Sequence, residues 1–399
     1  MGKGKKGRIG ILTGGGDVPG LNPAIRAVTV RAVREGFDVV GIRRGWAGLV
    51  EIDRDADADN GACVLPLTKE LVNHYMRTGG TFLHSSRTRP SAVPLKDVPA
   101  HLAGKYTDEK NDLTDEVIAN LDYLGIDHLI PIGGDDTLSY GVELGKRGVP
   151  LVALPKTMDN DVPGTDYCIG FSTCVTRTVN ITNQMKTSAG SHERIMIVEV
   201  FGRYAGFTAL LPTIAGAAHR CVIPEWEFDI ERLAEILVED RNQHPDKYSV
   251  CLVSEGAKAR GGAMQFQGSE TDQYGHAKLG GIGQQVSAKI KELAPAHNDG
   301  RKIDMISMNL GYMVRSGDPD AIDAIVPMAY GNLAVDLLLR GDHGRMVALR
   351  NGRYDSVPID TVVAYKKVVD VDKFYDTERY RPTYASFELQ PMLVLGAAS

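Results

Sequence analysis

Short apolar runs alternate with amphipathic stretches along most of the chain. The apolar run 9–12 is followed by a glycine loop, by a helical pattern over 22–36 and by a second apolar run at 38–42. An apolar run, a helix and another apolar run predict two parallel strands covered by the helix that connects them. The start of the chain therefore predicts a βαβ unit.

The same alternation recurs further along the chain. It predicts helices over 115–126, 137–148, 229–243 and 282–293, and strands over 127–134, 150–156, 194–202 and 248–256. Residues 318–341 predict one or two more helices, and the last thirty or so residues predict short strands and loops. The pattern is typical of an α/β protein with mainly parallel sheets. We expect two halves that divide near 160–180, and a surface insertion at 88–115.

Composition argues against several classes of function and of site. The chain of 399 residues fits two domains, and its net charge of −6 gives no support to nucleic-acid binding. We find no apolar run of about 18 residues and no signal-peptide pattern, so we expect a cytoplasmic protein without a membrane partner. Five cysteines without a C-x-x-C pair favour reduced, buried thiols over disulfides or a zinc site.

Three glycines follow the first predicted strand, in "GGGDVPG". Backbone N–H groups of Gly14, Gly15 and Gly16 could cradle an anion there, helped by the helix N-terminus. A purely structural tight turn would look the same. The loop is not a P-loop, since no Gly-Lys-Ser/Thr follows, and its spacing does not fit the dinucleotide fingerprint.

Two carboxylates follow the strand at 127–134, in "PIGGDDTL". Asp135 is placed to hold Mg²⁺, which takes one or two carboxylates together with phosphate oxygens. A helix N-cap is the alternative for one of the two aspartates. The acidic loop 53–61 fails the calcium-loop template, because Asn60 and Pro66 stand where Gly and Glu are needed, and it is interpreted as a solvated loop.

A third polar loop, "PKTMDNDVPGTD", follows the strand at 150–156. A carboxylate such as Asp159 or Asp161 within reach of a hydroxyl can act as a general base. Lys156 beside it can neutralise charge that develops on a phosphate. A plain Asx-turn explains the same residue types equally well.

Together these loops resemble the phosphofructokinase family. The segments 79–87, 191–207, 254–256 and 310–323 also look like family segments in the right order, so the resemblance covers roughly residues 8–365. It implies two three-layer, Rossmann-like domains. Residues 1–170, with about 315–365 returning, would bind the phosphoryl donor and Mg²⁺; 171–314 would bind the sugar phosphate, and 366–399 would be an extension.

The resemblance implies roles on the donor side. Gly15, Gly16 and Arg87 would contact the donor, and Asp135 would hold Mg²⁺. Asp159 would take the proton from the sugar 1-hydroxyl, with Thr157 and Asp161 positioning the acceptor and the phosphates.

It also implies roles on the sugar side. Arg194 would reach the 6-phosphate of a neighbouring subunit, so we expect a homo-oligomer, either a dimer or a tetramer. Surface ion pairs are the alternative for each arginine. The remaining expected contacts to the sugar phosphate or the transferring group come from Phe201, Gly202, Arg203, Glu255, Tyr312 and Arg315.

Two residues indicate the donor. Family members that use ATP usually have Gly at the positions of Asp136 and Lys156. Asp136 would repel a nucleotide's α-phosphate, while pyrophosphate would still fit, and Lys156 would stabilise the leaving phosphate. The expected reaction is reversible transfer from pyrophosphate to fructose 6-phosphate, giving fructose 1,6-bisphosphate and phosphate, in glycolysis or gluconeogenesis. An ATP-dependent or donor-promiscuous enzyme, a silent regulatory subunit and a nicotinamide dehydrogenase are the alternatives.

The chain departs from the family pattern in two places. Ile306 replaces an arginine of the 6-phosphate site, so that site is expected to be weaker or to be completed elsewhere, by Lys302 or by the C-terminal extension. Val30 replaces the second of two helix arginines, of which Arg26 is the first. We therefore expect weak or absent control by nucleotide diphosphates or phosphoenolpyruvate.

Overall fold

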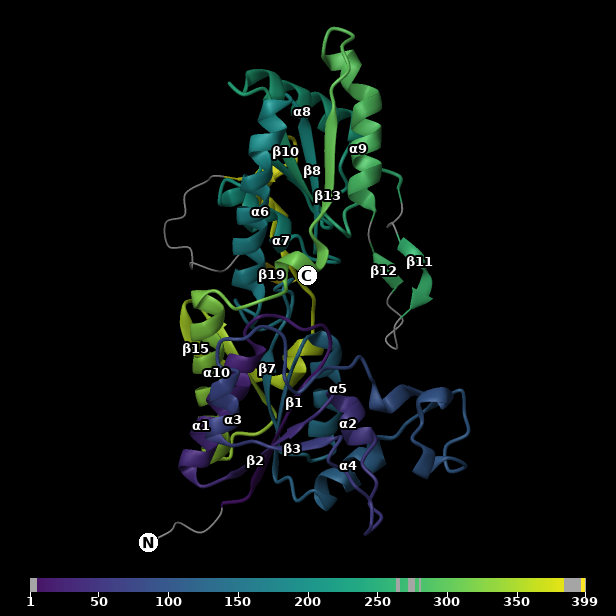
Figure 1. The fold of residues 1–399 in the computed structure, drawn as a ribbon, viewed down its shortest axis with the longest axis vertical. Helices are drawn as coiled ribbons and strands as arrows, with labels where there is room; N and C mark the ends of the chain where they lie inside the picture. The colour runs from purple at the N-terminus through teal and green to yellow at the C-terminus, as the bar shows by residue number, and fades with distance from the viewer. Residues whose placement is uncertain (1–5, 263–265, 272–276, 280, 384–395, 399) are drawn as a thin grey trace.

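Two β-sheets, one above the other along the long axis of the molecule, organise the chain (Figure 1). The computed structural model describes residues 6–262, 266–271, 277–279, 281–383 and 396–398. The lobe at the bottom of Figure 1 holds a seven-stranded sheet, and the lobe at the top holds a four-stranded sheet. The predicted α/β class is confirmed.

The seven-stranded sheet has the order β15-β14-β7-β6-β1-β2-β3. All neighbours are parallel except at the two edges, where β15 and β3 run antiparallel. Its central strands are mostly apolar because helices cover both faces, and Ile9, Ile11 and Ile130 are fully buried. The strands are β1 Arg8–Thr13, β2 Asp38–Ile42, β3 Val64–Pro66, β6 His128–Gly133, β7 Val152–Pro155, β14 Arg345–Arg350 and β15 Arg353–Pro358.

Two sets of helices cover this sheet. On one face α1 (Leu21–Glu35) packs against α10 (Ala321–Arg340) and the short α3 (Lys69–His74). On the other lie α2 (Trp46–Val50), α4 (Thr114–Tyr123) and α5 (Asp135–Lys146). The predicted insertion holds only short pieces: η1 Pro90–Ala92, β4 Val93–Pro94, η2 Leu95–Asp97, η3 Ala100–Leu102 and β5 Lys110–Asn111.

The four-stranded sheet is entirely parallel, in the order β13-β8-β10-β9. Its strands are β8 Ile195–Val200, β9 Arg220–Val222, β10 Ser249–Ser254 and β13 Met305–Asn309. Helices α6 (Phe171–Ser191) and α7 (Phe207–Ile214) pack together against it, as do α8 (Ile230–Gln243) and α9 (Ile282–Leu293), which η4 (Ala294–His297) follows. A hairpin of β11 (Phe266–Thr271) and β12 (Ala277–Leu279) lies beside this lobe (Figure 1).

The chain ends in the short strands and turns that the sequence predicts. After η5 (Gly311–Val314), α10, β14 and β15 come η6 (Ile359–Val363), β16 (Lys367–Val369), α11 (Val371–Phe374), β17 (Tyr375–Asp376) and β18 (Arg381–Pro382). β16 pairs with β19 (Gly396–Ala398), and β18 lies against β9. The parts of the predicted extension at 384–395 and 399 lie outside the described residues.

A buried carboxylate ties the first turns of α6 and α10 together. Asp323 is fully buried and accepts hydrogen bonds from the Tyr167 hydroxyl (2.5 Å) and the Gly170 amide (2.7 Å). It also accepts from the amide and the hydroxyl of Thr173, at 2.8 and 2.6 Å. Because α6 belongs to the upper lobe and α10 to the lower, this carboxylate links the two.

Three expectations from composition can be compared with the structure. All five cysteines are buried and free, as predicted. In the acidic loop 53–61, side chains accept hydrogen bonds from nearby backbone amides, as in a solvated turn. α10 is long and apolar enough to cross a membrane, but half of its most apolar window is buried and it packs along α1, as core helices do.

Candidate active site

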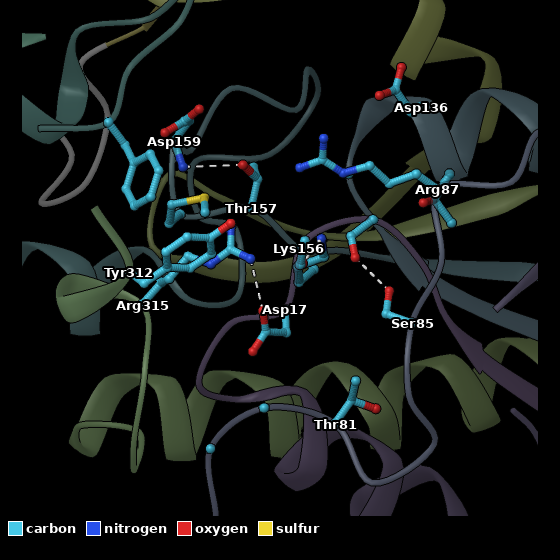
Figure 2. A pocket seen from close by; sticks show the side chains of 18 of the residues that line it. Asp17, Thr81, Ser85, Arg87, Asp136, Lys156, Thr157, Asp159, Tyr312 and Arg315 are labelled. Carbon is cyan, nitrogen blue, oxygen red and sulfur yellow. Dashed lines mark hydrogen bonds and ion pairs between the residues drawn. The ribbon is translucent and has the colours of Figure 1, made fainter. Parts of the chain in front are cut away.

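A cleft of about 1730 Å³ lies between the two sheets. Loops from the carboxyl ends of β1, β6 and β7 form its lower wall, and loops from the ends of β8, β10 and β13 form its upper wall. Parallel sheets bind ligands at this edge, because loops from several strands meet there. Figure 2 shows the side chains that the cleft brings together.

The glycine loop after β1 is held by hydrogen bonds within the protein. The Gly14 amide donates to the Ile132 carbonyl (3.0 Å), and the Gly15 amide donates to the Ser86 carbonyl (2.9 Å). The prediction that these two amides cradle an anion is therefore wrong. Gly15 and Gly16 still line the cleft, and a Cβ at Gly16 would lie 2.9 Å from Nη1 of Arg315, so only glycine lets that guanidinium approach.

The segment 79–87 supports this loop. Ser85 Oγ donates to the Gly15 carbonyl, and the hydroxyls of Thr13 and Thr81 lie 2.9 Å apart. Only Arg87 was predicted here from the sequence, although the clustered glycines and hydroxyls of this segment are a signal for a loop at a binding site. Tyr75, Met158, Tyr204 and Asn309 also line the cleft and were not predicted.

Lys156 is a buried cation beneath the glycine loop. It is 4% exposed, and its Nζ donates to the Gly16 carbonyl at 2.6 Å. Burial and the positive charge of Arg315 lower the pKa of Lys156 to about 8, against the opposite effect of Asp135. The ammonium group is thus fixed beside the place where a phosphate would meet the loop.

Asp135 and Asp136 open helix α5. Gly134 is the N-cap of this helix, so the alternative that one of these aspartates is the cap is wrong. The amide of Asp136 donates to Oδ1 of Asp135 at 2.9 Å. Both side chains line the cleft at a helix N-terminus, where the helix dipole favours anions. Figure 2 shows Asp136 near Arg87, with Lys156 between this pair and Asp159 in that view.

The loop after β7 contains a local turn and the carboxylate of Asp159. The Asp159 amide donates to Thr157 Oγ1 at 3.1 Å, and Asn160 bonds the backbone of Asp166 and Cys168. Side-chain turn bonds are therefore present, as the alternative interpretation required, but they are made by Thr157 and Asn160. Oδ1 of Asp159 is buried and has no hydrogen-bond partner among the described residues.

The carboxylates of this site have raised pKa values. Burial and the charge of Glu255 raise the pKa of Asp159 to about 7, against the opposing charge of Arg203. Burial and the charge of Asp159 raise the pKa of Asp161 well above its usual value. Burial also raises the pKa of Glu255 to about 7. A carboxylate with a pKa near neutrality is suited to accept a proton in catalysis.

The upper wall supplies the residues expected on the sugar side. Phe201, Arg203, Glu255 and Tyr312 all line the cleft. Arg315 lies between the walls: its Nη2 donates to Asp17 Oδ1 at 2.8 Å, and its guanidinium carbon is 4.8 Å from the centre of the Tyr312 ring. In this structure Arg315 therefore contacts the glycine loop after β1.

Three predicted residues lie outside the cleft. Arg194 immediately precedes β8, whose opposite end carries Phe201 into the site, and Arg194 Nε is buried without a partner among the described residues. Gly202 has φ 116° and no room for a side chain, since a Cβ would lie 2.8 Å from the Ala205 carbonyl. Lys302 likewise precedes β13, at the end opposite Tyr312, so it does not complete the sugar-phosphate site within one chain.

The carboxylates fit a hard cation that arrives with phosphate. The negative charge of Asp135 contributes to the raised pKa values of both Asp159 and Asp161, so the three side chains are within electrostatic reach of one another. Among the described residues, no group of three or more His, Cys, Asp or Glu side chains forms a metal cage. Mg²⁺ needs no such cage, because it keeps waters and phosphate oxygens as ligands.

Comparisons with known proteins identify the family of the chain. The family model described as "Phosphofructokinase" matches residues 8–338. The chain is 37% identical to "ATP-dependent 6-phosphofructokinase 3" of Streptomyces coelicolor, covering 93% of this chain and 99% of that protein. It is 35% identical to "Pyrophosphate–fructose 6-phosphate 1-phosphotransferase" of Dictyoglomus thermophilum, covering 93% and 97%.

A solved structure shares the fold. That of the pyrophosphate-dependent phosphofructokinase from Nitrosospira multiformis aligns with 98% of this chain and 93% of its own, with a TM-score of 0.72 at 18% identity. The loops of the cleft, the matched family model and the near full-length relatives lead to one conclusion. The chain belongs to the phosphofructokinase family.

Proposed function

We propose that the protein transfers a phosphoryl group reversibly between pyrophosphate and the 1-hydroxyl of fructose 6-phosphate. Curated relatives at similar identity are named for either ATP or pyrophosphate, so family membership does not decide the donor. The observation that carries the proposal is the pair Asp136 and Lys156, which both line the donor side of the cleft. A buried ammonium favours a compact anion, and the carboxylate at the start of α5 opposes a longer polyphosphate.

In this mechanism Asp159 is the general base. Its buried oxygen without a partner is available to accept the proton of the 1-hydroxyl, and its pKa near 7 suits that task. Thr157 orients Asp159 through the hydrogen bond to its amide. In the reverse direction the protonated carboxyl returns the proton to the sugar oxygen.

Cations of the chain stabilise the phosphoryl group during transfer. Lys156 faces the glycine loop, and we assign Arg203 to the transferring group from the upper wall. Asp135 would hold Mg²⁺, which would neutralise negative charge on the phosphates when bound. Glu255 accepts hydrogen bonds from sugar hydroxyls, and Tyr312 and Arg315 contact the 6-phosphate.

The quaternary structure is part of the proposal. Arg194 is too far from the cleft of its own chain, since it stands at the opposite end of β8. We assign it to the sugar-phosphate site of a neighbouring subunit, within a homo-oligomer. Loss of activity on dilution to the monomer, with recovery on concentration, would support this assignment.

The donor is tested by initial rates on fructose 6-phosphate with Mg²⁺, comparing pyrophosphate and ATP at matched concentrations. We expect turnover with pyrophosphate, and the reverse reaction from fructose 1,6-bisphosphate and phosphate. Turnover with ATP alone would leave Asp159 as the base but refute the donor role of Asp136. The second candidate, an ATP-dependent enzyme, is favoured by the names of several relatives.

A further inference from the structure

A short segment after η6 contacts both lobes directly behind the cleft. This segment, residues 365–369, is here called the strap; it lies beyond residue 338, where the family match ends. On the lower lobe the Tyr365 hydroxyl accepts a hydrogen bond from the Gly164 amide at 3.0 Å. Lys367 Nζ donates to the Asp166 carbonyl at 3.4 Å. Gly164 and Asp166 continue the loop that carries Asp159, so the strap braces that loop from behind.

On the upper lobe the strap reaches the loop that carries Arg203. The Val369 amide donates to Glu225 Oε1 at 2.8 Å, and the Gly206 amide donates to the same oxygen at 2.9 Å. One carboxylate oxygen therefore joins the strap to a residue three positions after Arg203. The backbone at Gly206 packs closely against Ile223, since a Cβ added at this position would lie 2.5 Å from that side chain.

Two lysines of the strap flank the same loop. Lys366 Nζ lies 4.3 Å from the centre of the Tyr204 ring, and Tyr204 lines the cleft. Lys367 Nζ lies 5.3 Å from the centre of the Phe207 ring. Both distances fall within the range of cation–π attraction. The second half of the loop 201–207 is thus contacted at Tyr204 and Phe207 by a segment from outside the family match.

The buried charge of Lys367 is difficult to explain by a contribution to stability alone. Its side chain is buried, with the residue 8% exposed, and its hydrogen bond of 3.4 Å is long. Burying an ammonium group costs free energy of folding unless it is well paired. Its charge does, however, favour the ionised form of Asp161, which lines the cleft.

We propose that the strap is a positioning device for catalysis, with Lys367 as a positioning residue behind the cleft. It holds the loop that carries Asp159 at a fixed distance from the loop that carries Arg203, so the base and the arginine face the same reacting group. The inference rests on the proposed function for the roles of Asp159 and Arg203. The clamping itself depends only on the contacts of the strap.

The test uses two variants of the full-length protein and one control. Lys367→Met removes the charge and keeps an apolar side chain of similar length, and Tyr365→Phe removes the hydroxyl that holds Gly164. Lys373→Met is the matched control, because Lys373 lies in the same extension with its side chain 66% exposed. Amide hydrogen exchange is measured for peptides spanning 157–166 and 201–207, and kcat and KM are measured with whichever donor supports turnover of the unaltered enzyme.

We expect faster exchange in both loops for Lys367→Met and Tyr365→Phe, and unchanged exchange in the control. We also expect kcat to fall by at least about fivefold while KM for fructose 6-phosphate changes by less than about threefold, since misplaced groups slow the chemical step more than binding. Unchanged exchange, or a kcat within about twofold of the unaltered enzyme, overturns the proposal.

A result that refutes pyrophosphate as the donor can be distinguished from a result that refutes the role of the strap. Turnover with ATP in place of pyrophosphate would refute the proposed donor and leave the exchange result and the kcat effect intact. If Lys367→Met did not fold, Tyr365→Phe, which removes a single hydroxyl from a half-buried side chain, would carry the same test.

Discussion

Arg315 and Asp17 form an ion pair of 2.8 Å that joins the glycine loop after β1 to the segment after β13. The guanidinium is mostly buried, with the Arg315 side chain 11% exposed, and the Tyr312 ring lies against it. A charge-assisted bond in such a site is stronger than an exposed one. If Arg315 binds the sugar 6-phosphate, it must first leave Asp17.

Asp17→Asn should therefore improve binding of the sugar. Removing the negative charge releases Arg315, and we expect KM for fructose 6-phosphate to fall by about threefold or more, because the binding-competent state becomes more populated. Steady-state kinetics with saturating donor measure this. A raised KM would mean that the pair is retained in the complex and helps to shape the site.

Asp159→Asn should separate activity from stability. We expect kcat to fall by at least about 100-fold, the usual contribution of a general base. The melting temperature should rise, because the variant removes a buried negative charge that the like charges of Glu255 and Asp135 repel. Thermal unfolding and initial rates are measured on the same preparation, and a near-normal kcat would refute the assignment of the base.

The activity should fall on acidification near neutral pH. The pKa of Asp159 is raised to about 7, and only the ionised carboxylate accepts a proton, so kcat/KM should rise with pH up to about that value and then level off. An ordinary carboxylate, with a pKa near 4, would leave the rate flat above about pH 5.

Glu255→Gln provides the control for this pH profile. The negative charge of Glu255 contributes to the raised pKa of Asp159, so its removal should move the acid limb to lower pH. The two carboxyls interact, so the measured value belongs to the pair. An acid limb that stayed in place would mean that another group titrates.

Asp136→Asn should change donor preference without changing side-chain size. Removing one negative charge from the donor side should raise kcat/KM for ATP by at least about tenfold, since like charges in contact cost several kcal/mol. Asp115→Asn is a suitable control, because Asp115 is also the second residue of its helix, α4, and is exposed. Equal ATP rates in both variants would rule out electrostatic exclusion by Asp136.

Asp323→Ala should destabilise the protein strongly. The substitution leaves the amides of Gly170 and Thr173 and two hydroxyls without their acceptor, at a cost of about 3 kcal/mol or more. We expect a clear drop in the midpoint of denaturant unfolding. Asp318→Ala, at an exposed position nearby, should leave the midpoint almost unchanged.

The sequence predicts the sheets well where apolar runs are uninterrupted. β2, β6, β7, β8 and β10 all lie within predicted strands, and β1 extends the predicted strand 9–12 by one residue at each end, because strands buried on both faces are built mostly of apolar residues. Helix α6 was not predicted, since its many threonines and β-branched residues have low helix propensity and packing between the lobes decides its structure. The β14–β15 hairpin was also missed, although Asn351–Gly352, both with positive φ, is a strong hairpin signal.

The candidate site was also predicted only in part: its residues were identified, but several of their contacts were not. Fourteen of the sixteen site residues predicted from the ordered motifs line one cleft, and Arg194 and Gly202 lie outside it. The ion pair between Arg315 and Asp17 was not predicted, because it joins residues 298 positions apart and depends on how the lobes meet. The bonds of Gly14 and Gly15 were missed because a glycine pattern does not say which acceptors its amides will find.

The two walls of the cleft come from different sheets, and this separation has an evolutionary consequence. Under the proposed function, most residues assigned to the phosphoryl donor follow β1, β6 and β7, whereas Phe201, Arg203 and Glu255, assigned to the sugar and the transferring group, follow β8 and β10. Mutations in the loops of one sheet can therefore alter the energy source of the reaction while selection keeps the sugar-binding half intact. A few substitutions in the loops of the lower wall could therefore change the phosphoryl donor while each intermediate protein still binds the sugar phosphate.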